Sequence, residues 1–131
     1  MWQRLRDDGG ASAVEFAFIV PLLILLVVGI AEFGRAFQVD STLNAAAREG
    51  VRMMALQNDQ AATRATVRSV ASSLNPAITD AQITISPSSC PVSSTGSTNV
   101  TVTIAYPLPF FTGFFGAGVT LHATGVMRCN G

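Results

Sequence analysis

Charged residues are scarce in this chain of 131 residues, and lysine is absent. Asp, Glu, Lys and Arg make up 12% of the sequence, about half of what globular proteins average. The eight basic residues are dispersed arginines, so no stretch can track a phosphate backbone and nucleic acid is not an expected partner. His122, the single histidine, cannot build a metal site alone, and no motif for nucleophilic or phosphate chemistry occurs. We therefore expect no enzyme, no cofactor and no small-molecule substrate.

A long apolar run near the N-terminus stands out against this low charge. No residue from Phe16 to Ala31 is charged, and a helix over residues 11–34 would be about 36 Å long, enough for a hydrocarbon core of about 30 Å. Arg4 and Arg6 precede it, which favours a cytoplasmic N-terminus. The expected organisation is a cytoplasmic leader at residues 1–10, a transmembrane helix at 11–34 and an extracytoplasmic domain at 35–131.

A cleaved secretory signal is the alternative for the same run. Gly29-Ile30-Ala31 has small residues at the spacing that signal peptidase uses, and cleavage there would release a small secreted domain. Acidic residues crowd the approach to the apolar run, where such signals carry positive charge, and this disfavours the alternative.

The period of the apolar residues predicts that the membrane helix continues into the outer domain. Spacings of three and four continue beyond residue 35 and define one apolar stripe. Its members are Ala36, Val39, Leu43, Ala46, Ala47, Gly50 and Met54. Glu49 and Arg52 fall off this stripe at a spacing of three, which indicates a solvated flank.

A second, shorter helix is expected after the first. Asn58 or Asp59 can cap its N-terminus, and Asn75-Pro76 is expected to end it. Its apolar positions are Val67, Val70, Ala71 and Leu74.

After Pro76 the apolar period changes to two, which predicts strands. Three segments alternate, around residues 83–85, 100–106 and 119–124, and residues 107–109 are expected to close the second. Residues 86–99 are rich in Ser, Pro, Thr and Gly, which is typical of a connecting loop. The predicted fold class is α+β: a long N-terminal transmembrane helix, a second helix, and a three-stranded (or slightly larger) antiparallel sheet.

A glycine pair and an acid stand directly before the apolar run. Gly9 and Gly10 are poor helix formers, and we expect them to be extended and open to a peptidase. A cut after Gly10 would create an amine on Ala11, and Glu15 lies about 6 Å further along a helix axis. A neighbouring subunit shifted by that distance could set its amine against Glu15. The alternative is that Glu15 is an interfacial acid at the mouth of an ordinary anchor.

Several segments of the chain together resemble the TadE-like (TadE/TadG) family. They are Gly10-Ala11-Ser12-Ala13-Val14-Glu15-Phe16-Ala17, Pro21 in the apolar run, Glu32-Phe33-Gly34-Arg35, and Ala45-Ala46-Ala47-Arg48-Glu49-Gly50-Val51-Arg52. The resemblance covers residues 9–54. It implies a pseudopilin, a minor pilin-like subunit of the tight-adherence secretion system that assembles thin Flp pili, processed by a dedicated prepilin peptidase.

The resemblance also implies roles for single residues. Gly10 is the residue before the cut, Ala11 the first residue of the mature chain and Glu15 the fifth. Phe16 stands where the major Flp pilins usually carry tyrosine, which favours a minor subunit. The implied partners are the bacterial inner membrane, the prepilin peptidase, and other pilin and pseudopilin subunits. An uncleaved single-pass accessory protein of the envelope is the alternative.

Pro21 lies inside the predicted membrane helix. It removes a backbone donor and clashes with the preceding turn, so a kink or a loosened turn is expected, which could help a subunit leave the lipid. The alternative is that the membrane helix accommodates Pro21 by local repair.

Four phenylalanines, Phe110, Phe111, Phe114 and Phe115, fall in a short Gly-containing loop between the second and third strands. We expect some of them to cover the small core. The alternative is an exposed apolar patch that docks on the membrane surface or on a neighbouring subunit.

The two cysteines, Cys90 and Cys129, both lie in the segment placed outside the cytoplasm. That side of the membrane is oxidising, and a small domain has little core of its own. We therefore expect these two cysteines to form a disulfide.

Overall fold

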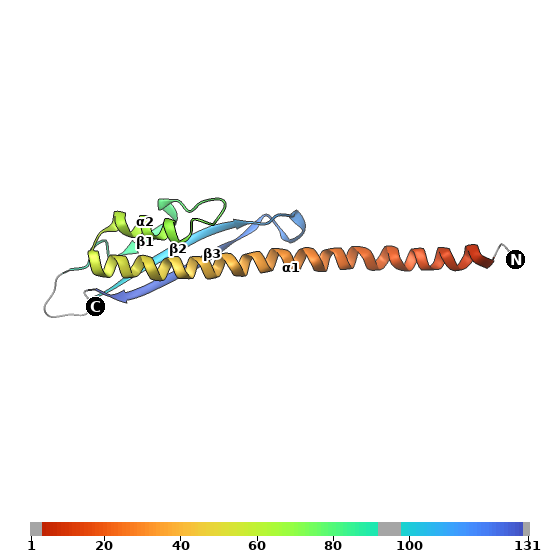
Figure 1. Cartoon of the computed structure of the whole chain (residues 1–131), viewed down its shortest axis with the longest axis horizontal. Helices are drawn as coiled ribbons and strands as arrows, with labels where there is room; N and C mark the ends of the chain where they lie inside the picture. Colours follow the sequence, from red (N-terminus) through yellow and green to blue (C-terminus); the bar gives the residue numbers. More distant parts are fainter. Residues whose placement is uncertain (1–3, 92–97, 130–131) are drawn as a thin grey trace.

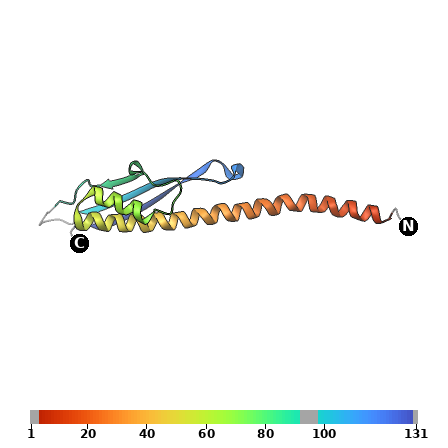
Figure 2. The ribbon, with the colours of Figure 1, turned by 45° about the horizontal axis from the view of Figure 1, so that its top comes forward.

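The computed structural model describes residues 4–91 and 98–129, with side chains from Gly9 onward. One long helix, α1 (Arg4–Gln57), carries a small α+β domain on its C-terminal half, while its N-terminal half stands free of that domain (Figures 1 and 2). The predicted fold class is confirmed. Residues 1–3 of the predicted leader and 92–97 of the predicted loop lie outside the described residues.

The predicted three-stranded sheet is confirmed. Its strands are antiparallel in the order β1-β2-β3, and Ile104 at the centre of β2 pairs with Ile83 on one side and Ala123 on the other. β2 runs through residues 107–109 and ends at Pro109. The elements after α1 are α2 (Gln60–Val70), the 3₁₀ turn η1 (Asp80–Gln82), β1 (Ile83–Ser86), β2 (Asn99–Pro109), the 3₁₀ turn η2 (Gly113–Phe115) and β3 (Gly118–Arg128).

The core lies between the outer half of α1, α2 and one face of the sheet. The predicted apolar stripe of α1 is buried there, apart from the partly buried Ala36. Alternate residues of β2 complete the core, as the period of two predicts. They are Val100, Val102, Ile104, Tyr106 and Leu108.

Two glycines allow the elements of the core to approach closely. A β-carbon on Gly50 of α1 would lie 2.5 Å from Val67 of α2, and one on Gly125 of β3 would lie 2.5 Å from the carbonyl oxygen of Ala47. Neither distance leaves room for a side chain at the glycine. The backbone of α1 therefore packs directly against α2 at Gly50, and the backbone of β3 packs directly against α1 at Gly125.

The second helix begins as predicted and ends earlier than predicted. The Asp59 carboxylate accepts hydrogen bonds from the backbone N–H groups of Ala61 and Ala62, at 2.9 and 3.1 Å. The helix stops at Val70, because the chain turns at residue 71 and the N–H of Leu74 bonds back to the carbonyl of Ala71. Leu74 reaches the core from this turn, so its apolar period did not signal further helix.

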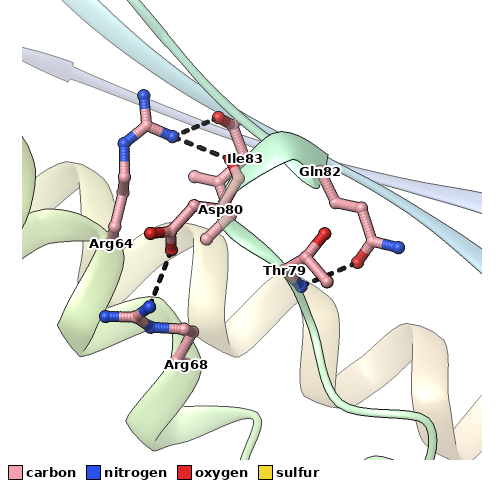
Figure 3. Close-up of polar contacts among 6 residues, drawn as sticks. All are labelled: Arg64, Arg68, Thr79, Asp80, Gln82 and Ile83. Atoms are coloured by element: carbon pink, nitrogen blue, oxygen red, sulfur yellow. Dashed lines mark hydrogen bonds and ion pairs between the residues drawn. The ribbon is translucent and has the colours of Figure 1, made fainter.

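Arginines of α2 fasten that helix to the start of β1 (Figure 3). The Arg64 guanidinium donates to the carbonyl oxygens of Asp80 and Ile83, at 2.9 and 2.6 Å. The Arg68 guanidinium lies 2.9 Å from the Asp80 carboxylate. These contacts hold the edge strand β1 beside α2.

Candidate functional site

The residues predicted to form the cleavage site, or to pair between subunits, all lie in the N-terminal part of α1. We call residues 9–31 the inner half of this helix and residues 32–57 its outer half. Gly10, Ala11, Glu15, Phe16 and Pro21 are exposed. Ala11 and Glu15 are four residues apart in one helix, so they lie on the same face of α1. The helix therefore presents the predicted amine and the predicted carboxylate to the same side.

The expectation of an extended peptide at Gly9 and Gly10 is wrong, because α1 already begins at Arg4 and includes both glycines. A helix that has formed extends at low cost, and each glycine lowers its stability by only about 1 kcal/mol relative to alanine. Both glycines are exposed, and a β-carbon on either would meet no atom within 4 Å. The predicted cut therefore lies in an open helical segment.

Glu15 has no polar partner among the described side chains of the subunit. Among the side chains that the structure describes, none forms a hydrogen bond or an ion pair with its carboxylate. The apolar residues around it are also exposed: Phe16 by 69%, Phe18 by 79% and Leu22 by 65%. From Gly9 to Ala31, α1 thus has neither its apolar surface nor its one acid, Glu15, covered by the described part of the same chain.

Pro21 does not interrupt α1. The helix is continuous through this residue, and Figure 2 shows a gentle curve along its N-terminal half. Local repair of the helix, the second of the two readings of Pro21, describes this geometry better than a broken turn does.

A buried acid at the outer end of the apolar run was not singled out by the sequence. Glu32 is 2% exposed, and its Oε1 accepts hydrogen bonds from the backbone N–H of Thr112 at 2.8 Å and from its hydroxyl at 3.3 Å. Its Oε2 is buried without a partner among the described atoms. The only signal was an acid inside an apolar run, because its partner lies 80 residues further along the chain.

Arg35, one turn beyond Glu32, joins α1 to two other segments. Its guanidinium donates to the carbonyl oxygens of Pro109 at 2.7 Å and Asn75 at 3.3 Å. It also lies over the ring of Phe111, 4.1 Å from the ring centre. Glu32 and Arg35 together hold the tip of the β2–β3 hairpin against the helix.

The expectation that phenylalanines of this loop cover the core is wrong. Phe111 is 73% exposed, Phe114 69% and Phe115 38%, and none of them belongs to the core cluster. The hairpin extends beyond the last core layer, so these rings have no core beneath them. Phe115 instead packs edge-on against Phe33 of α1, with 5.8 Å between ring centres.

The outer domain contains the expected disulfide and an exposed histidine. Cys90 and Cys129 are joined, with 5.5 Å between their α-carbons, and both are buried. The bond links the segment after β1 to the end of β3. His122 points outward from β3, away from the core.

Tyr106 ties the sheet to the turn after α2. Its hydroxyl donates to the carbonyl oxygen of Pro76 at 2.6 Å, and its side chain is buried in the core. Burial raises the pKa of the Tyr106 phenol above its usual value, and the positive charge of Arg35 opposes that rise. The domain thus holds this phenol in its neutral form.

One long apolar helix that carries a small α+β domain suggests a single-pass membrane protein. α1 is long and apolar enough to cross a bilayer, and the most apolar stretch of it is wholly unburied. Residues 10–52 match the family model described as TadE-like protein, which confirms the predicted resemblance over that segment of α1. Neither a curated protein nor a solved structure matches the chain. The match covers about a third of the chain, all of it in α1.

Proposed function

We propose that this protein is a minor pseudopilin, an assembly subunit of a tight-adherence, type IV-like (Flp) pilus that a prepilin peptidase processes. The observation that carries the proposal is the TadE-like match. It begins at Gly10 and lies within α1, whose most apolar stretch is unburied. TadE-like proteins are pilus components and are not known as an enzyme family. A role through assembly contacts, without catalysis, agrees with this.

In the proposed arrangement, residues 1–10 are a cytoplasmic leader, residues 11–34 cross the inner membrane, and residues 35–131 form the outer domain. The peptidase removes the leader by cutting between Gly10 and Ala11. The open surroundings of Gly10 support this, because no side chain of the described domain lies near enough to obstruct the enzyme.

The new amine on Ala11 is proposed to pair with Glu15 of a neighbouring subunit. Both groups lie on one face of α1, and an axial shift of about 6 Å between neighbouring subunits brings one against the other. An unpaired carboxylate costs about 2.5 kcal/mol or more at the centre of a membrane span and less towards its ends, so pairing favours the assembly. No described side chain of the same subunit pairs with Glu15, which leaves it available for a neighbour.

Intact-mass analysis of the protein, isolated from cells that carry the cognate peptidase, tests the cut. A mature chain that begins at Ala11 is lighter than the full chain of 13.7 kDa by about 1.2 kDa, the mass of ten residues. Replacing Gly10 by leucine should leave the uncut precursor in the membrane with a folded outer domain. Gly9→Leu is the matched control, because Gly9 is equally open and lies one residue before the cut.

Two other N-termini would contradict the proposal in different ways. A chain that retains Met1 would be an uncleaved envelope accessory protein. A chain that begins at Glu32 would be a secreted domain released by signal peptidase.

A further inference from the structure

The tip of the β2–β3 hairpin, residues 110–117, reaches back along α1 to the level of the membrane segment. Figure 1 shows this tip beside α1, beyond α2 and β1 on the side of the N-terminus. A β-carbon on Gly29 would lie 3.3 Å from the ring of Phe115. Gly29 is five residues before Gly34, the expected end of the span, and therefore lies about 7.5 Å inside it.

The surface of the tip is apolar and carries no charge. No Asp, Glu, Lys or Arg occurs anywhere from residue 81 to residue 127, and Phe111 and Phe114 of the tip are exposed by 73% and 69%. Both rings extend from a tight turn, where Gly116 adopts a φ of 102° that other residues rarely take. Aromatic rings exposed in this way are typical of contacts with lipid or protein.

Most polar groups at the base of the tip are already paired, and the exception among the described atoms is Oε2 of Glu32, which is buried without a partner. Both the N–H and the hydroxyl of Thr112 bond to Glu32, and the N–H of Phe110 bonds to the carbonyl of Ala117 at 3.2 Å. The Arg35 guanidinium caps the carbonyl of Pro109 and covers one face of Phe111. Such pairing suits a segment that leaves bulk water, and an arginine next to it suits the headgroup level.

An apolar groove runs between the tip and α1. Its volume is about 430 Å³, and it is lined by Phe115 of the tip and by residues of α1. These are Leu22, Leu25, Leu26, Gly29, Ile30 and Phe33. The groove is continuous with the unburied apolar surface of α1, which faces lipid in a spanning helix, so an acyl chain of the outer leaflet is the occupant that fits.

We propose that the β2–β3 hairpin tip inserts into the outer interface of the bilayer as a second membrane contact. Phe111 and Phe114 lie at the boundary of headgroups and acyl chains, and the groove beside Phe115 holds a lipid chain. The depth of about 7.5 Å agrees with the 5–10 Å at which apolar faces of interfacial elements commonly lie. The inference rests on the membrane span of the proposed function, and it does not depend on cleavage or on pilus assembly.

Tryptophan fluorescence of the full chain in phosphatidylcholine nanodiscs tests the proposal. Trp2, the only tryptophan, is replaced by Phe, and Phe114→Trp is introduced as the probe. Two matched variants bracket it: Phe18→Trp, at a 79% exposed site in the span, and Val126→Trp, at a 60% exposed site near the end of β3. Each is measured with acyl-chain-brominated lipid and with aqueous acrylamide.

The proposal predicts that Phe114→Trp behaves like Phe18→Trp. Its emission is blue-shifted, it loses most of its intensity in brominated lipid, and acrylamide quenches it weakly. Val126→Trp should show the opposite pattern. An unshifted, acrylamide-sensitive signal at position 114 would place the tip in water and overturn the proposal.

Protection of position 114 from both quenchers would mean that protein covers the tip, a second copy of the chain in this purified system, and would equally overturn it. If Phe18→Trp is also unaffected by brominated lipid, the membrane span itself fails. If brominated lipid quenches Phe18→Trp but not Phe114→Trp, the membrane span is supported and the second membrane contact is refuted.

Discussion

The two halves of α1 belong to one helix but meet different surroundings. From Gly9 to Ala31 the apolar side chains surround the helix on all sides and are almost all exposed. From Glu32 to Gln57 the domain buries one apolar stripe, and the apolar residues off that stripe, such as Phe33, Phe37 and Leu56, stay exposed. A helix that is apolar all round needs an apolar environment, whereas a striped helix needs only one partner face. The arrangement of apolar residues within α1, more than their number, separates membrane contact from folding.

This comparison makes opposite predictions for two acids on the same helix. Glu15→Ala, in the inner half, should abolish incorporation into the pilus while membrane insertion and stability of the outer domain stay unchanged, because no described side chain of the subunit pairs with Glu15. Glu49→Ala is the matched control, since that exposed acid only approaches Arg52 at 3.9 Å. Immunoblots of sheared pili and of membranes measure both properties. Wild-type incorporation of the Glu15 variant would refute the pairing.

Removing the disulfide should cause the largest loss of stability in the outer half. Cys90 and Cys129 are 39 residues apart, and closing such a loop contributes up to roughly 4 kcal/mol in the chain-entropy model. The Cys90→Ser/Cys129→Ser double variant should therefore unfold at much lower urea in pulse proteolysis of the detergent-solubilised chain. Reductant should destabilise the wild-type chain and leave the double variant unchanged. Two reactive thiols in denatured, unreduced protein from the envelope would show that the bond does not form.

Two glycine substitutions test how closely the sheet approaches the outer half of α1. Gly125→Ala should cost about 1–3 kcal/mol, because its new methyl group would meet the Ala47 carbonyl and force the sheet away from α1. Gly34→Ala in α1 is the control, because a β-carbon there meets nothing within 4 Å and no loss is expected. The same urea assay compares them. Equal stability of the two variants would mean that β3 does not approach α1 as closely as described.

The smallest predicted effect concerns pH and Tyr106. Its folded-state pKa is raised above the unfolded value of about 10, so the stability it contributes is complete below pH 10 and declines as the pH rises through the folded pKa. Tyr106→Phe should remove this alkaline decline and, through the lost hydrogen bond to Pro76, cost about 1 kcal/mol at neutral pH. Urea unfolding at pH 7 and in steps above pH 9 checks both, and an unchanged alkaline decline in the variant would assign it to another group.

Much of the fold could be predicted because the spacing of apolar residues along the chain determines the helices and strands. The apolar stripe of α1, the cap at Asp59 and the alternation along β2 each depend on neighbours within a few residues, and each is confirmed. The solvated flank at Glu49 and Arg52 follows from the same spacing. Features of this kind can be read directly from one sequence.

What escaped prediction depends on contacts between distant segments or on helix propagation. The burial of Glu32 requires Thr112, and the exposure of Phe111 requires knowing how far the hairpin extends past the core. The helical state of Gly9 and Gly10 reflects a helix that begins upstream, which residue propensity alone does not reveal. For the candidate site, the sequence located Gly10, Ala11 and Glu15 but no partner for any of them.

The continuity of α1 from the apolar segment into the core gives the molecule the mechanics of a lever. No hinge separates the two halves, and the 23 residues after Gly34 extend the helix by about 35 Å. A tilt of about 20° at the bilayer, an ordinary value for single helices, would move the far end of the helix sideways by about 12 Å. Membrane thickness and neighbouring helices would thus set where the sheet points, and a force that draws the helix out of lipid would move the whole outer domain with it.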